Sequence, residues 1–271
     1  MAKPHARKLG DVDPKSGKMS KEKAEAKLAE LHDRFLTIQQ AFIAQRQRAL
    51  VVLEGWDASG KGGLIRRLTA PFDPRVSKVW PIGAPTRAEQ EIHYLYRFWD
   101  RLPGPGTLAV FDRSWYGRVL VERVEELIAP KAWKRAYGEI NEFERMLTND
   151  GVRIIKLFLH ISKEEQLRRF EERLTVPYKR WKITLEDFRN RSRWKDYEKA
   201  IDAMLEQTSS KHAPWHVLPA DNKHYARVEG LTLIADHMSA GLDLSPPDLS
   251  PELRAEAARL GRSDPAAKSL D

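Results

Sequence analysis

A glycine-rich segment with a lysine offers the clearest chemistry in the sequence. Residues 55–61 read Gly-Trp-Asp-Ala-Ser-Gly-Lys and follow an apolar run at 49–54. This spacing is typical of loops in which glycines let several backbone N–H groups face one anion while the lysine adds a positive charge. We therefore predict a phosphate-binding loop, with an ordinary glycine turn as the alternative. The predicted contacts are Gly55, Ala58, Ser59, Gly60, Lys61, Gly62 and Gly63.

The loop lacks the hydroxyl that usually ligates a magnesium ion, because Gly62 stands where Ser or Thr normally follows the lysine. Asp57 lies inside the loop, where a carboxylate would repel phosphates unless a cation lay between them. Asp112 ends the apolar run 108–111 and could reach the same cation from a neighbouring strand. We predict that Asp57 and Asp112 hold Mg²⁺, with a helix N-cap or a turn as the alternative role.

Three arginines near these aspartates are candidates to bind phosphate. Arg113 directly follows Asp112, where a motor-type ATPase would carry a glutamate that positions a hydrolytic water. An arginine at this place would stabilise negative charge on a phosphoryl group in transfer, so the pattern favours transfer over hydrolysis. Arg66 and Arg118 are further candidates, although charged faces are often simply solvated.

The candidate residues fall at the ends of expected strands. Apolar runs predict strands at 49–54, 76–80, 108–111, 152–161 and 215–218, and helical patterns lie between them. Ser20 is expected to cap one helix, and Thr86 with Glu89 and Ser162 with Glu165 have the spacing of capping boxes. The alternation predicts an α/β fold with a parallel sheet, helices on both faces and the ligand site at the carboxyl ends of the strands.

We expect a single domain over residues 20–240. Residues 1–19 are polar, and residues 241–271 combine prolines with charged and small residues, so both ends are expected to be flexible. The stretch 173–194 is dense in Arg, Lys and aromatic residues with weak periodicity. We interpret it as an inserted, mobile segment, in which Trp181 or Trp194 could touch a base.

The composition narrows the class of protein. The chain has 271 residues, with 47 Lys and Arg against 39 Asp and Glu, and this excess favours an anionic partner. The absence of cysteine excludes disulfides, thiolate metal sites and a cysteine nucleophile. No stretch approaches the roughly 18 apolar residues of a membrane span, and we expect a cytoplasmic protein without membrane contact. The eight histidines show no metal-ligand spacing.

Two segments together resemble the signatures of the polyphosphate kinase 2 family. They are the loop at 55–62 and the sequence Phe-Asp-Arg-Ser-Trp-Tyr-Gly-Arg at 111–118, and the resemblance extends over roughly residues 20–240. It implies a three-layer P-loop kinase-like fold similar to that of thymidylate kinases, with a helical lid at about 173–194. It also implies reversible transfer of phosphoryl groups between inorganic polyphosphate and nucleotides, with Mg²⁺, or Mn²⁺ in its place, as cofactor.

The resemblance assigns roles to individual residues. Asp57 and Asp112 match the family's essential aspartates, Lys61 its loop lysine, Arg113 its Walker-B arginine and Arg173 the arginine that enters the lid. The implied acceptors are ADP and GDP, which become ATP and GTP, with AMP as a further acceptor. The segment 172–194 is more similar to that of the diphosphate-using members. A homotetramer or homodimer without a nucleic acid partner is expected.

Two other functions remain open from the sequence. One is an ATP-dependent nucleoside monophosphate kinase. Thymidylate kinases share the phosphate loop, an Asp-Arg pair after the Walker-B strand and a basic lid. The other is a polyanion-binding or RNA-binding module without catalysis, which the basic composition permits. Such a module has no need for paired aspartates beside a phosphate loop.

Overall fold

The computed structural model describes residues 8–246 and 248–260, and its core is a five-stranded parallel sheet. The strands are β1 (Arg48–Gly55), β2 (Ser77–Pro81), β3 (Thr107–Asp112), β4 (Val152–His160) and β5 (Trp215–Pro219), in the order β2-β3-β1-β4-β5. The central strand β1 buries its six inner residues, as expected for a strand covered on both faces. The predicted α/β fold with a parallel sheet is confirmed.

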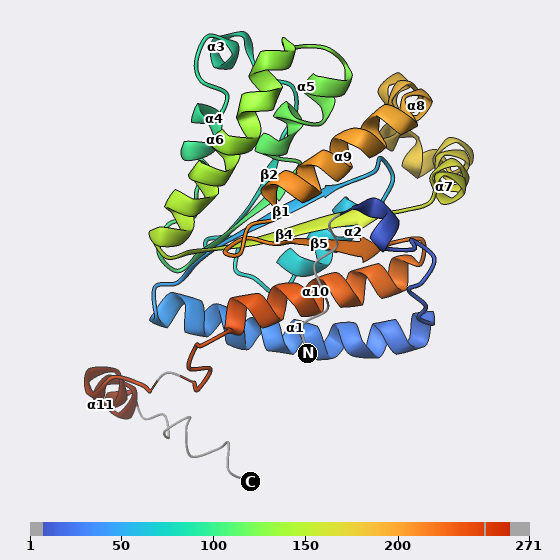
Figure 1. Ribbon diagram of the computed structural model, residues 1–271. Coiled ribbons are helices and arrows are strands. Elements are labelled where there is room, and N and C mark those ends of the chain that lie inside the picture. The colour runs from blue at the N-terminus through green and yellow to red at the C-terminus, as the bar shows by residue number, and fades with distance from the viewer. Residues whose placement is uncertain (1–7, 247, 261–271) are drawn as a thin grey trace.

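Helices cover both faces of the sheet and form the two outer layers (Figure 1). The helices α1 (Lys21–Ala44), α2 (Lys61–Thr69) and α10 (Lys223–Ser239) lie on one face, while α6 (Pro130–Asn149) and α9 (Trp194–Thr208) lie on the other. Shorter elements complete the described chain: η1 (Leu9–Asp11), α3 (Arg87–Gln90), α4 (Tyr96–Trp99), η2 (Trp115–Arg118), α5 (Val121–Val124), α7 (Lys163–Thr175), η3 (Pro177–Lys182), α8 (Leu185–Ser192) and α11 (Pro251–Arg259). No helix within the described residues is long and apolar enough to span a membrane.

Two of the three predicted helix caps form completely. Ser20 accepts the N–H of Lys23 at the start of α1, and Thr86 and Glu89 make both bonds of a capping box at α3. At α7 the Ser162 hydroxyl accepts the N–H of Glu165, but the reciprocal bond is absent and that half of the prediction is wrong. The Glu165 carboxylate instead pairs with two arginines of the same helix, because guanidinium donors bind a carboxylate more strongly than a neutral amide does.

Part of the N-terminal segment that we expect to be flexible lies against the domain. Leu9 is buried and its N–H donates to Asp202 in α9 over 2.8 Å, and the Pro14 carbonyl accepts the N–H of Asp221. In the predicted tail, α11 begins at Pro251 and has no buried residue. Residues 1–7, 247 and 261–271 of the two predicted ends lie outside the described residues, and the flexibility of both ends stays a prediction.

The segment 173–194 is helical over most of its length. It comprises the end of α7, all of η3 and α8, and the first residue of α9. No residue of η3 is buried, and Tyr178, Trp181 and Leu185 are among the most exposed large side chains of the described chain. This exposure explains the weak hydrophobic periodicity, because helices that bury little surface need no apolar stripe.

Candidate active site

The loop between β1 and α2 has a backbone shaped for an anion. Gly55 has φ +149°, and a Cβ at this position would lie 2.6 Å from the carbonyl oxygen of Leu159 in β4, so a side chain cannot be accommodated. Gly60 has φ +110° and precedes the first turn of α2. The backbone N–H groups of residues 60–62 donate no hydrogen bond within the described chain. Together with the positive end of the α2 dipole, they form an anion-binding position.

Lys61 is the first residue of α2 and folds back over this loop. Its Nζ donates to the carbonyl of Gly55 over 2.9 Å. Burial lowers the pKa of the Lys61 ammonium group, and the nearby carboxylates of Asp112 and Asp57 act in the opposite direction. The structure thus brings the predicted lysine and both predicted aspartates within electrostatic reach of one another.

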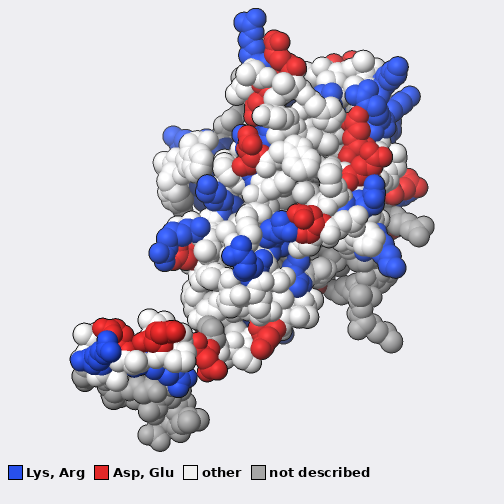
Figure 2. All heavy atoms as spheres, turned by 90° about the vertical axis from the view of Figure 1, so that its left-hand side faces the viewer, with Lys and Arg blue, Asp and Glu red and all other residues white. Residues whose placement is uncertain are grey.

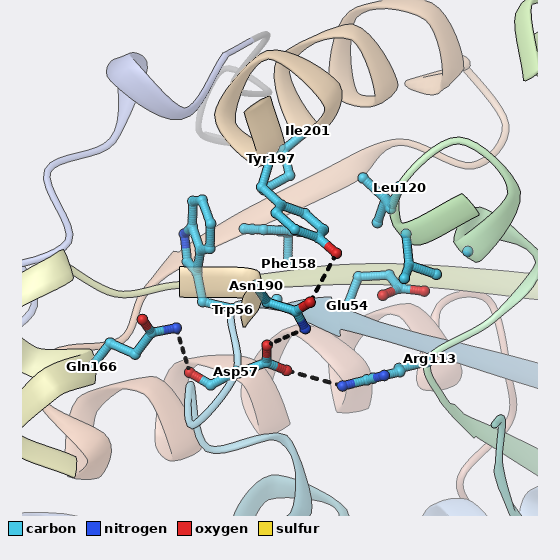
Figure 3. A pocket seen from close by; sticks show the side chains of 13 residues that line it. Glu54, Trp56, Asp57, Arg113, Leu120, Phe158, Gln166, Asn190, Tyr197 and Ile201 are labelled. Atoms are coloured by element: carbon cyan, nitrogen blue, oxygen red, sulfur yellow. Dashed lines mark hydrogen bonds and ion pairs between the residues drawn. The ribbon is translucent and has the colours of Figure 1, made fainter. Parts of the chain in front are cut away.

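Asp57 connects three segments of the chain through its carboxylate (Figure 3). One oxygen lies 2.9 Å from Nη2 of Arg113, and the other accepts a 2.9 Å hydrogen bond from Nδ2 of Asn190 in α8. Burial alone would lower the pKa of Arg113, but the carboxylates of Asp57, Glu54 and Asp112 outweigh it and raise the pKa. The arginine therefore stays fully charged at the edge of the sheet where β1 and β3 end.

Two residues of this site have a strained backbone. Ala58 and Arg113 have φ +61° and +65°, in the left-handed region that residues with a side chain seldom adopt. This conformation costs roughly 1–2 kcal/mol per residue, and such strain is concentrated at functional sites. At Arg113 the turn follows directly after β3, and the side chain reaches Asp57 in the phosphate loop.

A buried glutamate completes the floor of the site. Glu54, the last residue before the loop, is 4% exposed and accepts a 2.8 Å hydrogen bond from the hydroxyl of Ser114. Burial raises the pKa of the Glu54 carboxyl, although Ser114 and the charges of Lys61 and Arg113 partly offset this effect. The sequence interpretation missed Glu54, because it reads as the end of a buried strand.

Side chains of the helix α7 donate hydrogen bonds to backbone carbonyls of the phosphate loop. The side-chain amide of Gln166 donates to the carbonyl of Asp57 over 3.1 Å. Nη1 of Arg169 donates to the carbonyls of Ala58 and Ser59 over 2.9 and 2.8 Å. The sequence interpretation did not identify Gln166 or Arg169, because a hydrogen bond from a side chain to a distant backbone group leaves no recognisable sequence motif. Their spacing of three residues on one helix face is the only signal.

A tryptophan stack joins the phosphate loop to the end of the segment 173–194. The rings of Trp56 and Trp194 are 3.6 Å apart and nearly parallel, at 3°. Nε1 of Trp56 also donates to Nδ1 of His160 over 3.1 Å. Of the two tryptophans proposed to touch a base, Trp194 is buried in this stack at 7% exposure, whereas Trp181 is 77% exposed.

A buried polar network fixes the chain that follows Arg113. Glu144 of α6 accepts hydrogen bonds from Nε1 of Trp115 and from the hydroxyl of Tyr116, over 3.1 and 2.7 Å. The fully buried Lys156 of β4 lies 2.6 Å from the same carboxylate and donates to the Tyr116 hydroxyl. These bonds anchor η2 to the sheet and thereby support the Asp112-Arg113 turn.

A pocket opens between the phosphate loop and the helices α8 and α9 (Figure 3). Its polar side is formed by Asp57, Arg113 and Asn190, whereas Leu120 and Phe158 provide apolar walls. Charged groups therefore face one end of a ligand, while the remainder of the ligand would contact hydrocarbon. Such a mixture of apolar walls and a few fixed polar groups is typical of small-molecule sites.

The remaining predicted residues lie at different distances from this pocket. Arg173 donates to the Lys182 carbonyl. Burial lowers the pKa of Arg173, while the nearby carboxylates of Asp187 and Asp57 act in the opposite direction, so Arg173 lies within electrostatic reach of Asp57. Arg118 pairs with Glu122 over 2.6 Å and lies over the Tyr94 ring, and it does not line the pocket. Arg66 is exposed on α2.

The carboxylates of this site fit a Mg²⁺ ion that is bound partly by the protein and partly by phosphate oxygens and water. Within the described residues no group of three or more acidic or histidine side chains could enclose a metal ion. Mg²⁺, however, usually takes one or two carboxylates and completes its shell with phosphate oxygens and water. Asp57 and Asp112, the latter at the end of β3, supply that number of oxygen donors beside the loop.

Comparisons with known proteins agree on one family. The chain matches the family model "Polyphosphate kinase 2 (PPK2)" over residues 18–243. It is 51% identical over 190 residues to a Polyphosphate:AMP phosphotransferase of Pseudomonas syringae pv. tomato, a match that covers 70% of this chain and 38% of that protein. The match thus covers well under half the length of this relative.

Two further similarities extend over more of the other protein. An AMP/ADP-polyphosphate phosphotransferase of Meiothermus ruber is 42% identical over 199 residues, which is 73% of this chain and 74% of that protein. A crystal structure of Polyphosphate Kinase 2 from Arthrobacter aurescens TC1 superimposes with a TM-score of 0.87 at 35% identity. That superposition covers 94% of this chain and 93% of the other.

Proposed function

The chain belongs to the polyphosphate kinase 2 family, and from this membership we propose that it transfers phosphoryl groups between inorganic polyphosphate and nucleoside phosphates. The observation that carries the proposal is the junction at Asp57, where the phosphate loop, Arg113 and Asn190 meet at the edge of a pocket with apolar walls. A phosphate chain at the loop and a nucleotide in the pocket would meet at this junction.

The proposed reaction is a direct displacement at phosphorus. A terminal phosphate oxygen of the acceptor nucleotide forms a bond to the terminal phosphorus of polyphosphate. The bond between that phosphorus and its bridging oxygen breaks, and the shortened chain leaves with the oxygen and its electron pair. The acceptor oxygen is already ionised, so the step needs no general base.

Positioning and charge stabilisation supply most of the catalysis in such a transfer. We propose that Lys61 and the free N–H groups at the start of α2 bind the end of the polyphosphate chain, and that Arg113 stabilises charge on the group in transfer. Arg173 would add positive charge from the lid side. Asp57 and Asp112 would hold Mg²⁺ or Mn²⁺, which when bound neutralises phosphate charge.

The acceptor is proposed to be a nucleoside monophosphate as well as a diphosphate. The relative at 51% identity is named for AMP, and the relative at 42% identity is named for AMP and ADP. These names support AMP beside ADP as an acceptor, which widens the expectation from the lid sequence that diphosphates are preferred. GDP is retained as a third acceptor for testing.

One experiment separates this function from its rivals. The protein is incubated with Mg²⁺ and AMP, ADP or GDP, once with long-chain polyphosphate and once with ATP as donor, and the products are separated by chromatography. We expect ADP and ATP to form from polyphosphate. Transfer to AMP from ATP but not from polyphosphate would instead identify a nucleoside monophosphate kinase. Lack of transfer from both donors, in protein that still binds RNA, would favour a binding module.

A further inference from the structure

Two ion pairs, named here the α5–α8 connection, link the end of α5 to the segment 173–194. Glu125 directly follows α5, and its Oε2 lies 3.1 Å from Nε of Arg189 in α8. Glu126 is the next residue, and its Oε1 lies 3.3 Å from Nη2 of Arg193, which joins α8 to α9. Two successive glutamates are thus paired with two arginines at the end of α8.

The residue of α8 that reaches the phosphate loop stands directly beside this connection. Asn190 follows Arg189 in the chain and donates to the carboxylate of Asp57 over 2.9 Å. Its Oδ1 accepts a 3.2 Å hydrogen bond from the hydroxyl of Tyr197 in α9. Burial, followed by the charge of Glu125, raises the pKa of this hydroxyl of Tyr197. Glu125 therefore lies close to the point at which α8 meets the phosphate loop.

The α5–α8 connection joins two walls of the pocket. Leu120 and Val121 line the pocket at the start of α5, whereas Asn190, Tyr197 and Ile201 line it from α8 and α9 (Figure 3). A change in the separation of α5 and α8 would therefore change the width of the pocket.

The acidic side of the connection is fixed by the local backbone. Glu126 has φ +56°, in the left-handed region, and the N–H of Leu127 donates to the Glu122 carbonyl over 2.9 Å. The side chain of Glu125 is only 11% exposed, and its Oε1 is buried without a hydrogen-bond partner among the described residues. A buried carboxylate oxygen without a donor favours a second bond from the guanidinium group of Arg189.

Each arginine also has an acidic partner on its own side. Nη2 of Arg189 lies 3.4 Å from Glu186 in α8, and Nε of Arg193 lies 3.7 Å from Asp196 in α9. Both of these carboxylates are well exposed, in contrast to Glu125. The arginines could thus leave α5 without becoming unpaired. Two alternative sets of partners for the same side chains are what a segment with two positions requires.

Ion pairs also occur far from the pocket. Figure 2 shows the face at the amino ends of the strands, where acidic and basic side chains are interspersed. Arg48, the first residue of β1, pairs there with Asp150 over 2.8 Å. Neither residue lines the pocket, and the phosphate loop follows the other end of β1. This pair therefore offers a matched control for the connection.

We propose that Glu125 and Glu126 are positioning residues that hold α8 against α5 and thereby set the affinity for the acceptor nucleotide. This inference rests on the proposed function and extends it, because it assigns a role in nucleotide binding to residues that do not line the pocket. Through Arg189, Glu125 keeps Asn190 on Asp57 and narrows the pocket around the nucleotide. The polyphosphate end is proposed to bind at the start of α2, which neither ion pair contacts.

The test is a double-mutant cycle on the more buried pair. Glu125→Gln, Arg189→Gln and the double variant are assayed with ADP and long-chain polyphosphate. Each single variant is expected to raise KM for ADP by about fivefold, because a partly exposed ion pair contributes coupling at the low end of the usual range. The double variant is expected to equal the single variants, since either change alone breaks the pair. KM for polyphosphate is expected to change by less than about twofold, and kcat to fall by less than about threefold.

Two control variants make the result specific. Glu186→Gln removes the local partner of Arg189 but keeps Glu125, and it is expected not to raise KM for ADP. An increase equal to that of Glu125→Gln would overturn the proposal, because any loss of charge near Arg189 would then suffice. Asp150→Asn breaks the ion pair at the far end of β1 and is expected to leave both KM values unchanged. Thermal unfolding verifies that each variant is folded.

A distance measurement tests the connection without turnover. The chain has no cysteine, so Lys134→Cys in α6 and Leu185→Cys in α8 provide two exposed positions for spin labels. The distribution of distances between the labels is measured by pulsed electron paramagnetic resonance without substrates. In the double variant Glu125→Gln/Glu126→Gln we expect a broader distribution that extends to longer distances than in the labelled chain with both glutamates.

The two measurements separate failure of the connection from failure of the proposed function. A broader label distribution in the variant, in a protein that transfers no phosphate, would contradict the function but support the connection. Turnover by wild type, combined with unchanged label distances or with additive effects in the cycle, would overturn the connection. Equal increases in KM for ADP and for polyphosphate would also overturn it, because they would indicate a general disturbance of the site.

Discussion

Asn190 donates a 2.9 Å hydrogen bond to the carboxylate of Asp57, across 133 residues of sequence. The helix α8 and the phosphate loop therefore meet at the Asp57 side chain, whose other carboxylate oxygen is bound by Arg113. Since Asp57 is also a proposed ligand of Mg²⁺, a bound cation would share its carboxylate with Arg113 and Asn190.

Asp57→Asn is expected to lower turnover of ADP with polyphosphate at least about a hundredfold. The amide keeps the shape of the side chain but removes the charge that binds Arg113, and electrostatic effects of this kind contribute about 3 kcal/mol or more. Raising the Mg²⁺ concentration should restore the rate only partly. Turnover is measured across a Mg²⁺ titration for wild type, Asp57→Asn and Asp112→Asn, with folding checked by circular dichroism.

A matched control for this variant is Asp243→Asn, which changes an exposed aspartate that caps a turn at Ser245. The Asn side-chain oxygen can still accept the Ser245 N–H, so the change should cost less than about 1 kcal/mol and should not affect turnover. If folded Asp57→Asn also stays within a few-fold of wild type, Asp57 is a turn residue and the proposed metal site is wrong.

Lys61→Ala is expected to remove most turnover and leave the fold intact. The Lys61 ammonium group donates to the carbonyls of Gly55 and Trp56 in the phosphate loop, and Lys61 is not among the buried residues of the core. Steady-state rates and thermal unfolding are compared with those of Lys131→Ala, which removes an exposed lysine from α6. Near wild-type activity in folded Lys61→Ala would contradict the assignment of the loop.

Bound nucleotide and polyphosphate are expected to slow trypsin cleavage in the segment 173–194. Lys179, Arg180 and Lys182 lie in η3, which buries none of its residues, and lid closure over substrates would shield them. Cleavage at Arg254 in α11 provides an internal control that substrates should not alter. Fragments are identified by mass spectrometry, and equal cleavage rates in η3 with and without both substrates would contradict a closing lid.

His160→Gln is expected to flatten the pH dependence of the free energy of unfolding below about pH 6.5. Burial lowers the pKa of His160, and the neutral ring accepts the N–H of Trp56. The unfolded chain binds this proton at its ordinary pKa of about 6.5. The stabilisation is therefore complete above that pH and decreases as the pH falls towards the lower pKa of the folded state.

Urea unfolding at several pH values measures this effect in wild type and in His160→Gln. His212→Gln, which changes an exposed histidine, serves as the control and should follow the wild-type curve. A pH dependence of His160→Gln that matches wild type would show that His160 does not contribute to acid destabilisation.

Several features could be predicted because they depend on local sequence. A run of apolar residues followed by glycines and a lysine determines a buried strand and an anion-binding turn, and the carboxyl ends of parallel strands lie at one edge. Asp57, Lys61, Asp112 and Arg113 could therefore be placed together without knowledge of the fold. Family signatures in the same short segments strengthened that placement.

The contacts that complete the site depended on tertiary structure. Asn190, Gln166 and Arg169 reach the phosphate loop only because α7 and α8 pack beside it, and nothing in their local sequence specifies which backbone groups they meet. Glu125 and Arg189 lie far apart in the sequence, and each alone reads as an ordinary surface charge. Helix packing brings them together, because α5, which buries Val124, packs against α9, and α8 leads directly into α9.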